Sequence, residues 1–585
     1  MADYATEAAR FARTVQWVVE LDLDRCALTH GVSPCGAPAA ADGARCHYTF
    51  PSCQAPSTFQ RETRTLRFSL NEIPWQDSEN EAFPLLRQLV TTPQTVDPDA
   101  LTVYPEKITV SFFPDWNPLP LDRDKAAINT ARNGEFWRNL FVRNRNYSGR
   151  ALRVKRGFLA AGFTLPMFEQ IGPDYKITAV SVTDSEVKVT AESPLADLSK
   201  IDLPWTISET NTLQAAVTAT ATTFAVDDGE EFPDPATLTR SGVYLSCGAE
   251  FVRVVAVSGN TLTVQRGVLG SAALAHDKGD RLEHVLALGT PSDPRCVTDA
   301  ILDLLEWAKI PAAQIDADSF TAAKGSYWPA ADVCALVRRP KKASEILAQL
   351  REPRLLMLYL NESGKFTITI CGPVPAVAAL VDEQFVGGSV SVVEDMDARI
   401  TRVQFWYDPD VTGDSSSNDR FHRCVCAIDA SAEQPNNYGD VRSKTYTDAY
   451  LWPDCPTASV HNIGRRLITR LRNGLRSIAF ALDLKDAGSI AIGKCVTATT
   501  PDAVGLDGLP EERTYLVTSR KEASSTTVSF GATDITLMGR FLHVVPDTWT
   551  DDYDSASASE KSSGGYWGDD DNRVGAALEA GYVVW

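Results

Sequence analysis

Residues 26–53 read CALTHGVSPCGAPAAADGARCHYTFPSC and hold four of the chain's twelve cysteines. Glycine and proline recur throughout this stretch, which predicts a loop rather than a helix or a strand. The stretch has few large apolar side chains, so hydrophobic burial cannot close it into a compact unit. Four thiols offer a cross-link in its place. The cysteines are Cys26, Cys35, Cys46 and Cys53.

The spacing of these cysteines leaves three kinds of cross-link open. Two disulfides are possible, in any of three pairings. A tetrathiolate zinc site usually uses close Cys-x2-4-Cys pairs, which this segment lacks. An iron–sulfur cluster is larger than one ion, and four thiolates can reach it from well-separated loop positions. His30 and His47 flank the motif and could each replace a cysteine, although hydrogen-bonded loop histidines are the plainer interpretation.

Composition narrows the class of protein. At 585 residues and 44% hydrophobic, the chain is long enough for about four domains with sizeable cores. Its formal net charge of −20 disfavours binding to phosphate backbones. No apolar run reaches the length of a membrane span, and the polar start MADYATEAARFARTVQW does not resemble a signal peptide. We therefore expect synthesis in a reducing cytosol, which weakens the disulfide interpretation.

Short Val, Ile, Thr and Phe runs between turn residues predict a mainly β fold with α+β parts, built from β-barrel or sandwich domains with a few packed helices. Helices are expected over 83–94, 297–310, 343–351 and 457–473, and hairpins over 101–113, over 355–370 and at Ser258-Gly259-Asn260.

The same patterns divide the chain into six regions. They are 1–75, an N-terminal strand with the four-cysteine region; 76–205, a first domain; 206–288, an inserted small β module; 289–400, an α+β domain with a helix and a hairpin; 401–546, a second β domain with helix 457–473; and 547–585, an acidic Ser/Gly linker with an apolar terminal peptide.

Three smaller features have plain structural interpretations. Cys247 is expected to be a buried small hydrophobe without a local partner. Cys424 and Cys426 share one face of a strand and are expected to pack. The outer face of helix 457–473 is expected to be solvated; its arginines are Arg465, Arg466, Arg470 and Arg472.

Two segments carry a resemblance to a known family. The first is the strand VVELDLDRC at 18–26 with the four-cysteine motif that follows it, ending CHYTFPSCQAPSTFQRETRTLRFS. The second is KITVSFFPDWNPLPLDRDK followed by GEFWRNLFVRNRNYSGRALRVKRGF at 134–158. Both resemble the tail-tip, or baseplate hub, proteins of siphophages and gene transfer agents, over roughly residues 15–545. The insert, with GNTLTVQRG at 259–267, is similar to small β modules of phage tail proteins.

The resemblance implies a structural virion protein rather than an enzyme. By similarity to the tail-tip protein of phage lambda, it implies that Cys26, Cys35, Cys46 and Cys53 bind an iron–sulfur cluster of the [4Fe–4S] type, with zinc as the alternative. It also implies a homotrimer at the distal end of the tail, assembled in the host cytoplasm. Its partners would be the distal tail protein, the tape-measure protein and central fibre or tip proteins, and DNA would pass through the lumen without specific binding.

Two other classes of function stay open. A tail-associated peptidoglycan hydrolase would need an acid pair or a Cys/His pair in a cleft, and the sequence offers only His30 and His47 near the cysteines. The 206–288 insert could instead bind host glycans. Catalytic residues are not identified, because no triad or phosphate-binding glycine loop stands out.

Overall fold

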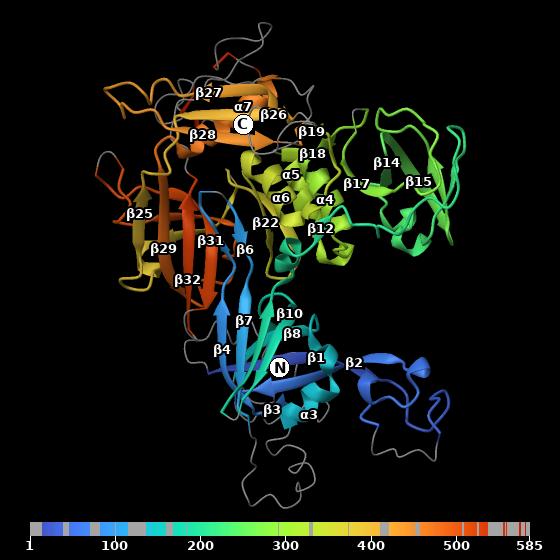
Figure 1. Ribbon diagram of the computed structural model, residues 1–585. Coiled ribbons are helices and arrows are strands. Elements are labelled where there is room, and N and C mark those ends of the chain that lie inside the picture. Colours follow the sequence, from blue (N-terminus) through green and yellow to red (C-terminus); the bar gives the residue numbers. More distant parts are fainter. Residues whose placement is uncertain are drawn as a thin grey trace, which may run out of the picture.

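The computed structural model describes residues 14–535 apart from 39–45, 71–81, 100, 115–135, 159–167, 184, 291, 327–330, 373, 410–420, 449, 452–456, 506–507 and 523–525, and a few positions near the C-terminus. Strands gathered into several sheets dominate it, with few helices, which confirms the predicted mainly β class with α+β parts (Figure 1). In this part of the chain no sheet closes into a barrel by its strand order. The helices found there are all too short or too polar to span a bilayer.

A nine-stranded sheet forms the N-terminal part of the molecule, drawn mostly in blue in Figure 1. Its order is β3-β2-β1-β8-β10-β11-β7-β4, with β9 beside β8, so the predicted regions 1–75 and 76–205 share one sheet. The strands are β1 (Val15–Cys26), β2 (Arg61–Ser69), β3 (Ala82–Phe83), β4 (Leu86–Thr92), β7 (Lys107–Phe112), β8 (Ala151–Phe158), β9 (Glu169–Gln170), β10 (Tyr175–Val182) and β11 (Val187–Glu192).

Helix α3 (Phe136–Arg143) packs on this sheet through aromatic contacts. Trp137 is 1% exposed, and its ring lies 5.0 Å from that of Phe68 and 4.8 Å from that of Phe112. Its indole N–H donates to the carbonyl of Phe113 at 3.0 Å, so its one polar atom is satisfied. The FW pair of the quoted segment therefore helps to form the core of the N-terminal sheet.

Two of the predicted elements in this part are wrong. Residues 83–94 were expected to be helical, but β3 and β4 occupy them, because the β-branched run Val90–Thr92 favours an extended backbone that pairs with β7. Residues 101–113 do not form a hairpin. Strand β6 (Val103–Tyr104) pairs with β5 (Thr95–Val96), whereas β7 pairs with β11 and β4.

The insert is all β as predicted, and the hairpin at Ser258-Gly259-Asn260 is confirmed, with Ser258 paired to Thr261. Its core is not separate, because Val254 of the insert and Leu304 of the next helix belong to one buried apolar cluster. The strands follow the order β13-β16-β15-β14-β17-β20. They are β13 (Thr223–Ala225), β14 (Val243–Cys247), β15 (Glu250–Ser258), β16 (Thr261–Gln265), β17 (Glu283–Leu288) and β20 (Ala335–Val337).

The central α+β region follows the insert, and its predicted helices over 297–310 and 343–351 are confirmed, as is the hairpin predicted over 355–370, whose strands pair from Leu356 to Ile370. Its apolar helix faces enter the same cluster that contains the insert's core. The elements are α4 (Val297–Trp307), α5 (Ala317–Ser326), α6 (Ala343–Arg351), β22 (Leu356–Leu360) and β23 (Phe366–Ile370), with the short strands β12 (Asp202–Leu203), β18 (Arg295–Cys296), β19 (Ala331–Val333) and β21 (Lys341–Lys342).

Two further sheets lie in the C-terminal part. An eight-stranded sheet has the order β24-β30-β31-β32-β29-β25, with β5 and β6 from the N-terminal region added beside β31, and a three-stranded sheet has the order β27-β26-β28. Their strands are β24 (Ala376–Val381), β25 (Ser391–Asp395), β26 (Arg402–Pro409), β27 (Phe421–Ile428), β28 (Ser443–Asp448), β29 (Leu475–Asp483), β30 (Cys495–Thr499), β31 (Arg513–Glu522) and β32 (Thr527–Asp534); the short pair β33 (Arg573–Val574) and β34 (Glu579–Ala580) lies near the C-terminus.

Helix α7 (Thr457–Leu471) covers the three-stranded sheet, and its predicted apolar face is buried. Its arginines are not simply solvated, however. Arg470 donates to the backbone carbonyls of Pro98 and Asp99, and Arg472 pairs with Asp429 at 3.2 Å. These partners lie far away in sequence, so a charge run read on its own could not reveal them.

The expectation that Cys424 and Cys426 pack in the interior is also wrong, because both are exposed on β27. They share a face of the strand as predicted, but that face points away from α7, and the alternate residues Val425 and Ala427 are buried instead. The two-residue period of a strand shows which residues share a face, but it does not show which of the two faces is buried.

Candidate functional site

The four-cysteine loop connects β1 to β2 at the edge of the N-terminal sheet and extends away from it (Figure 1). Strands β1 and β2 pair antiparallel along nine positions, from Val18–Ser69 to Cys26–Arg61. Cys26 is therefore the last residue of a rigid strand, and the other three cysteines lie in the loop that the strand pair supports.

Backbone hydrogen bonds fold this loop back on its base. The amide of Cys26 donates to the carbonyl of Tyr48 at 2.7 Å, and Ala27 donates to Gln60 at 2.9 Å. Two tight turns place the amides of Cys35 and Cys53 against the carbonyls three residues earlier, at 2.8 and 3.1 Å. Three of the four cysteines are thus held through their own backbone amides, and all four lie within the described residues 26–38 and 46–60.

The loop has no apolar core, as the sequence predicts. Among its described residues only Ala37 and Thr49 are buried, while Val32 and Phe50 are more than half exposed. None of the three buried apolar clusters found in the described chain contains a residue between 27 and 60. Hydrogen bonds alone add little net stability per bond, so the loop needs another source of stabilisation.

The cysteines offer four free donors of intermediate exposure, and none is in a disulfide. In this loop no three ligand atoms of Cys, His, Asp or Glu lie within 4.8 Å of one another. A tetrahedral zinc site with bonds of about 2.3 Å would hold its sulfurs about 3.8 Å apart. A cubane cluster accepts wider spacing, because each of its thiolates binds a different iron. Four free thiols on one loop are a donor set that either a zinc ion or an iron–sulfur cluster could use.

The two histidines beside the motif have different surroundings. The Nε2 atom of His30 lies 3.4 Å from Oε1 of Gln54, and the amide of His47 donates to Oγ of Ser52 at 3.1 Å. These contacts agree with the interpretation that both residues take part in the hydrogen bonding of the loop.

A ladder of acids and bases joins the two segments that carry the family resemblance. Strand β1 pairs antiparallel with β8, placing Glu20 opposite Arg153. The basic strip of β8 therefore meets acids of its own chain. The ion pairs and their distances are Glu20–Arg67 2.9 Å, Glu20–Arg153 3.1 Å, Glu20–Lys155 3.2 Å, Asp22–Arg153 2.6 Å, Asp24–Arg150 2.6 Å and Asp24–Arg61 2.9 Å.

Glu20 is the centre of this ladder and is 3% exposed. Burial by itself would raise the pKa of its carboxyl, but hydrogen bonds from Arg153 and Arg67 and the charge of Lys155 lower it below its usual value. A paired, ionised carboxylate at this depth fixes the register of β1 against β8. The ladder thus holds the strand that presents Cys26.

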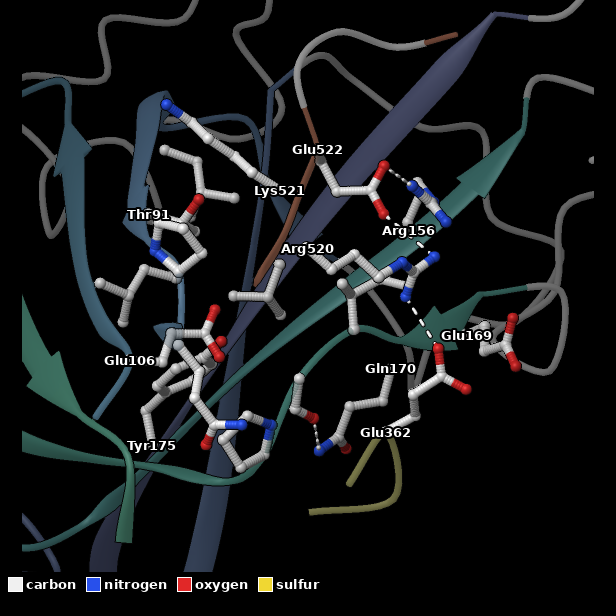
Figure 2. Close-up of a pocket in the computed structure, with 18 of the residues that line it drawn as sticks. Thr91, Glu106, Arg156, Glu169, Gln170, Tyr175, Glu362, Arg520, Lys521 and Glu522 are labelled. Carbon is white, nitrogen blue, oxygen red and sulfur yellow. Dashed lines mark hydrogen bonds and ion pairs between the residues drawn. The ribbon is translucent and has the colours of Figure 1, made fainter. Parts of the chain in front are cut away.

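A second candidate site is a cavity of about 620 Å³ between the N-terminal sheet, the turn of the β22–β23 hairpin and β31 (Figure 2). Most of the charged side chains that line this cavity form ion pairs. Arg156 of β8 lies 2.7 Å from Glu522 of β31, and Arg520 of β31 lies 2.8 Å from Glu362 of the hairpin turn. Side chains from three parts of the chain therefore meet here and tie the N-terminal sheet to the rest of the molecule.

Glu106 and Tyr175 form a hydrogen-bonded pair on one side of this cavity (Figure 2). Burial raises the pKa of Glu106 to about 7, and the hydrogen bond from the Tyr175 hydroxyl opposes this rise. A Cβ atom at Gly172, whose φ is +80°, would collide with the same hydroxyl. The pair is therefore closely enclosed, and the protonated carboxyl is favoured at mildly acidic pH.

This pair predicts a pH-dependent stability. Between pH 4.5 and about 7 the unfolded chain loses the Glu106 proton while the folded chain keeps it. The contribution of Glu106 to the free energy of unfolding therefore falls as pH rises, by about 3 kcal/mol in all. The variant Glu106→Gln keeps an acceptor for Tyr175 and cannot ionise. Its midpoint of thermal unfolding should exceed that of the wild type by a margin that grows from pH 5 to pH 8. Glu169→Gln, at the rim of the same cavity, is the control, and an equal trend in both variants would contradict the assignment.

No protein-family model matches this chain, and no curated protein matches it. Several solved structures are similar to it. A tail protein from Neisseria meningitidis MC58 is 10% identical over 76% of this chain and 90% of its own, with a TM-score of 0.37. The prophage tail protein gp18 from Listeria monocytogenes EGD-e is 8% identical over 76% and 87%, with a TM-score of 0.33. The 43 kDa tail protein of prophage MuSo2 from Shewanella oneidensis is 10% identical over 77% and 97%, with a TM-score of 0.31. TM-scores of this size are too low to establish a shared fold.

Proposed function

We propose that this chain is a structural protein of the tip of a phage-like tail, where it forms the central hub, and that Cys26, Cys35, Cys46 and Cys53 bind a [4Fe–4S] cluster. One observation carries the proposal. A loop with four free cysteines and no apolar core is held on β1, and β1 pairs with β8. These two strands belong to the two segments on which the resemblance to tail-tip proteins rests.

The cluster would serve as a structural cross-link. It would join the end of β1 to three positions of the loop, two of them on tight turns, and so replace the hydrophobic core that the loop lacks. When bound, the cluster supplies iron–sulfur bonds to the four thiolates. A loop stabilised in this way presents a rigid projection, which suits contact with a neighbouring tail protein or subunit.

A hub at the tail tip would act as a homotrimer in contact with the distal tail protein, the tape-measure protein and the central fibre or tip proteins. The net charge of −20 supports passage of DNA through its lumen, because acidic walls repel phosphates and prevent binding. A purified trimer should have three times the 63.7 kDa mass of one chain.

The location is tested on tail particles purified from producing cells. Gold-labelled antibodies raised against residues 27–60 should mark one end of each tail in electron micrographs. Label spread along the tail shaft, or tails that lack the chain, would contradict the proposal. The same antibodies on particles that carry Cys424→Ser, a substitution on the exposed face of β27, provide a control for particle integrity.

A further inference from the structure

The inserted β module holds a cluster of metal-ligating side chains that the proposed function does not use. Ligand atoms of Cys247, His276 and Asp280 all lie within 4.8 Å of one another, with Cys247 and His276 buried. Cys247 is 0% exposed, as expected from the sequence, but it has local partners after all. We propose that these three residues bind a zinc ion.

Two turns bring the ligands together. Cys247 and Glu250 pair across the two-residue turn between β14 and β15, in which Gly248 has φ +57°, so their side chains share one face of the hairpin. His276 and Asp280 lie on a second turn, in which Gly279 has φ +93° and the amide of Asp277 donates to Oδ2 of Asp280 at 3.0 Å. Backbone bonds between His276 and Val217 fix this turn against the module.

Glu250 orients the imidazole as a metal ligand requires. Nε2 of His276 lies 2.8 Å from Oε2 of Glu250, which is itself 0% exposed and held by Arg266 through two contacts of 2.6 Å. The paired contacts from Arg266 and a bond from the Leu274 amide at 2.9 Å hold Glu250 as a carboxylate acceptor. Nε2 therefore donates, and the lone pair stays on Nδ1. A carboxylate behind a histidine is the usual arrangement around zinc.

The spacing of the other ring nitrogen supports the same conclusion. Nδ1 of His276 lies 3.5 Å from Oδ2 of Asp280. Zinc bonds of about 2.0–2.1 Å to nitrogen and about 2.0–2.2 Å to oxygen give a tetrahedral N–O edge of about 3.4 Å. One thiolate, one imidazole and one carboxylate are a donor set suited to zinc. Three protein ligands leave a fourth tetrahedral position for water or another small ligand.

Charge also balances at this site. Arg266 neutralises Glu250, so the ionised Cys247 thiolate, the neutral imidazole and the Asp280 carboxylate together match the two positive charges of the ion. Zinc would bind as the proton of the Cys247 thiol leaves to solvent, because a coordinated thiol is deprotonated.

The test uses Co²⁺ as a zinc substitute on the full chain, because thiolate–cobalt charge-transfer absorption reports a sulfur ligand directly. The variants are Cys247→Ala, which leaves Glu250 and His276 unchanged, and Asp280→Asn, a conservative change at a side chain that is 44% exposed. Cys371→Ala, at a buried cysteine of the central region, is the matched control. Every sample retains the four-cysteine loop, so metal bound there is common to all of them.

Cys247→Ala should bind one Co²⁺ fewer per chain than the wild type and lose the absorption of one thiolate, whereas Cys371→Ala should lose neither. Asp280→Asn should weaken binding at this site at least about tenfold. A Cys247→Ala chain with the wild-type stoichiometry and spectrum would overturn the zinc site. If that variant does not fold, unchanged Co²⁺ affinity in Asp280→Asn would overturn it equally.

Discussion

Replacing Arg354 with alanine should destabilise the central α+β region by about 3–5 kcal/mol, because it removes the cation from a buried triad. Arg354 is 0% exposed. Its Nε atom lies 3.0 Å from Asp332 of β19, and its guanidinium lies 2.8 Å from Asp448 at the end of β28. Burial raises the pKa of Asp332, and Arg354 opposes that rise. Without Arg354, two carboxylates would remain buried and would lose the guanidinium that both of them contact.

Asp448 increases the expected effect, because it also accepts from the amides of Tyr450 and Leu451 at 2.8 and 3.1 Å. Loss of the triad should therefore loosen the backbone at Tyr450 and Leu451 as well. Hydrogen exchange of the full chain is the suitable measurement, since several domains do not unfold as one. Amides of α6 and β28 should exchange about a hundredfold faster or more, at about 1.4 kcal/mol per factor of ten.

The matched control for Arg354→Ala is Arg520→Ala. Arg520 pairs with Glu362, whose side chain is 55% exposed, and such a pair contributes less than about 1 kcal/mol. If Arg354→Ala exchanged no faster than Arg520→Ala, the buried triad would not stabilise this region as proposed.

Replacing Cys46 with serine should open the loop between β1 and β2 while the nine-stranded sheet stays folded. The sheet's apolar core includes Leu23 and Leu66 on the two strands but no residue of the loop, so the loop can unfold alone. Limited proteolysis of the full chain should show cleavage between residues 27 and 60 that is about tenfold faster or more, with the remaining fragments unchanged.

Cys424→Ser is the control for this proteolysis, because Cys424 is exposed on β27 and contributes to no proposed site. Equal cleavage in Cys46→Ser, Cys424→Ser and the wild type would mean that the loop is stable without the Cys46 thiol. Cleavage throughout the N-terminal sheet would mean that the loop and the sheet fold as one unit.

Helical periodicity made α4, α6 and α7 predictable, since an apolar stripe at intervals of three and four residues has few other interpretations. Strand β4 was missed because LRQLVTT has no clear period and depends on β7 for its hydrogen bonds. Alternating acids in β1 and alternating bases in β8 do signal that these strands pair, although 126 residues separate Asp24 from Arg150.

The two cysteine-containing sites also differ in whether the sequence alone could reveal them. The loop at 26–53 was visible because its four cysteines lie within one short segment of turn residues. The cluster of Cys247, His276 and Asp280 was not, because 29 residues and two strands separate Cys247 from His276, and only the packing of two turns brings them together. The period of a sequence relates residues that are near one another along the chain, whereas a site such as the Cys247 cluster depends on contacts between distant segments.

The most direct measurement for the central claim is the content of iron, zinc and acid-labile sulfide in the full chain purified without oxygen, together with its visible spectrum. We expect iron and sulfide in near-equal amounts, about four of each per chain for a [4Fe–4S] cluster, and the loss of both in Cys46→Ser but not in Cys424→Ser. Wild-type chains that contain no iron and no sulfide, or zinc at the four cysteines in their place, would contradict the cluster and remove the main support for the tail-tip assignment.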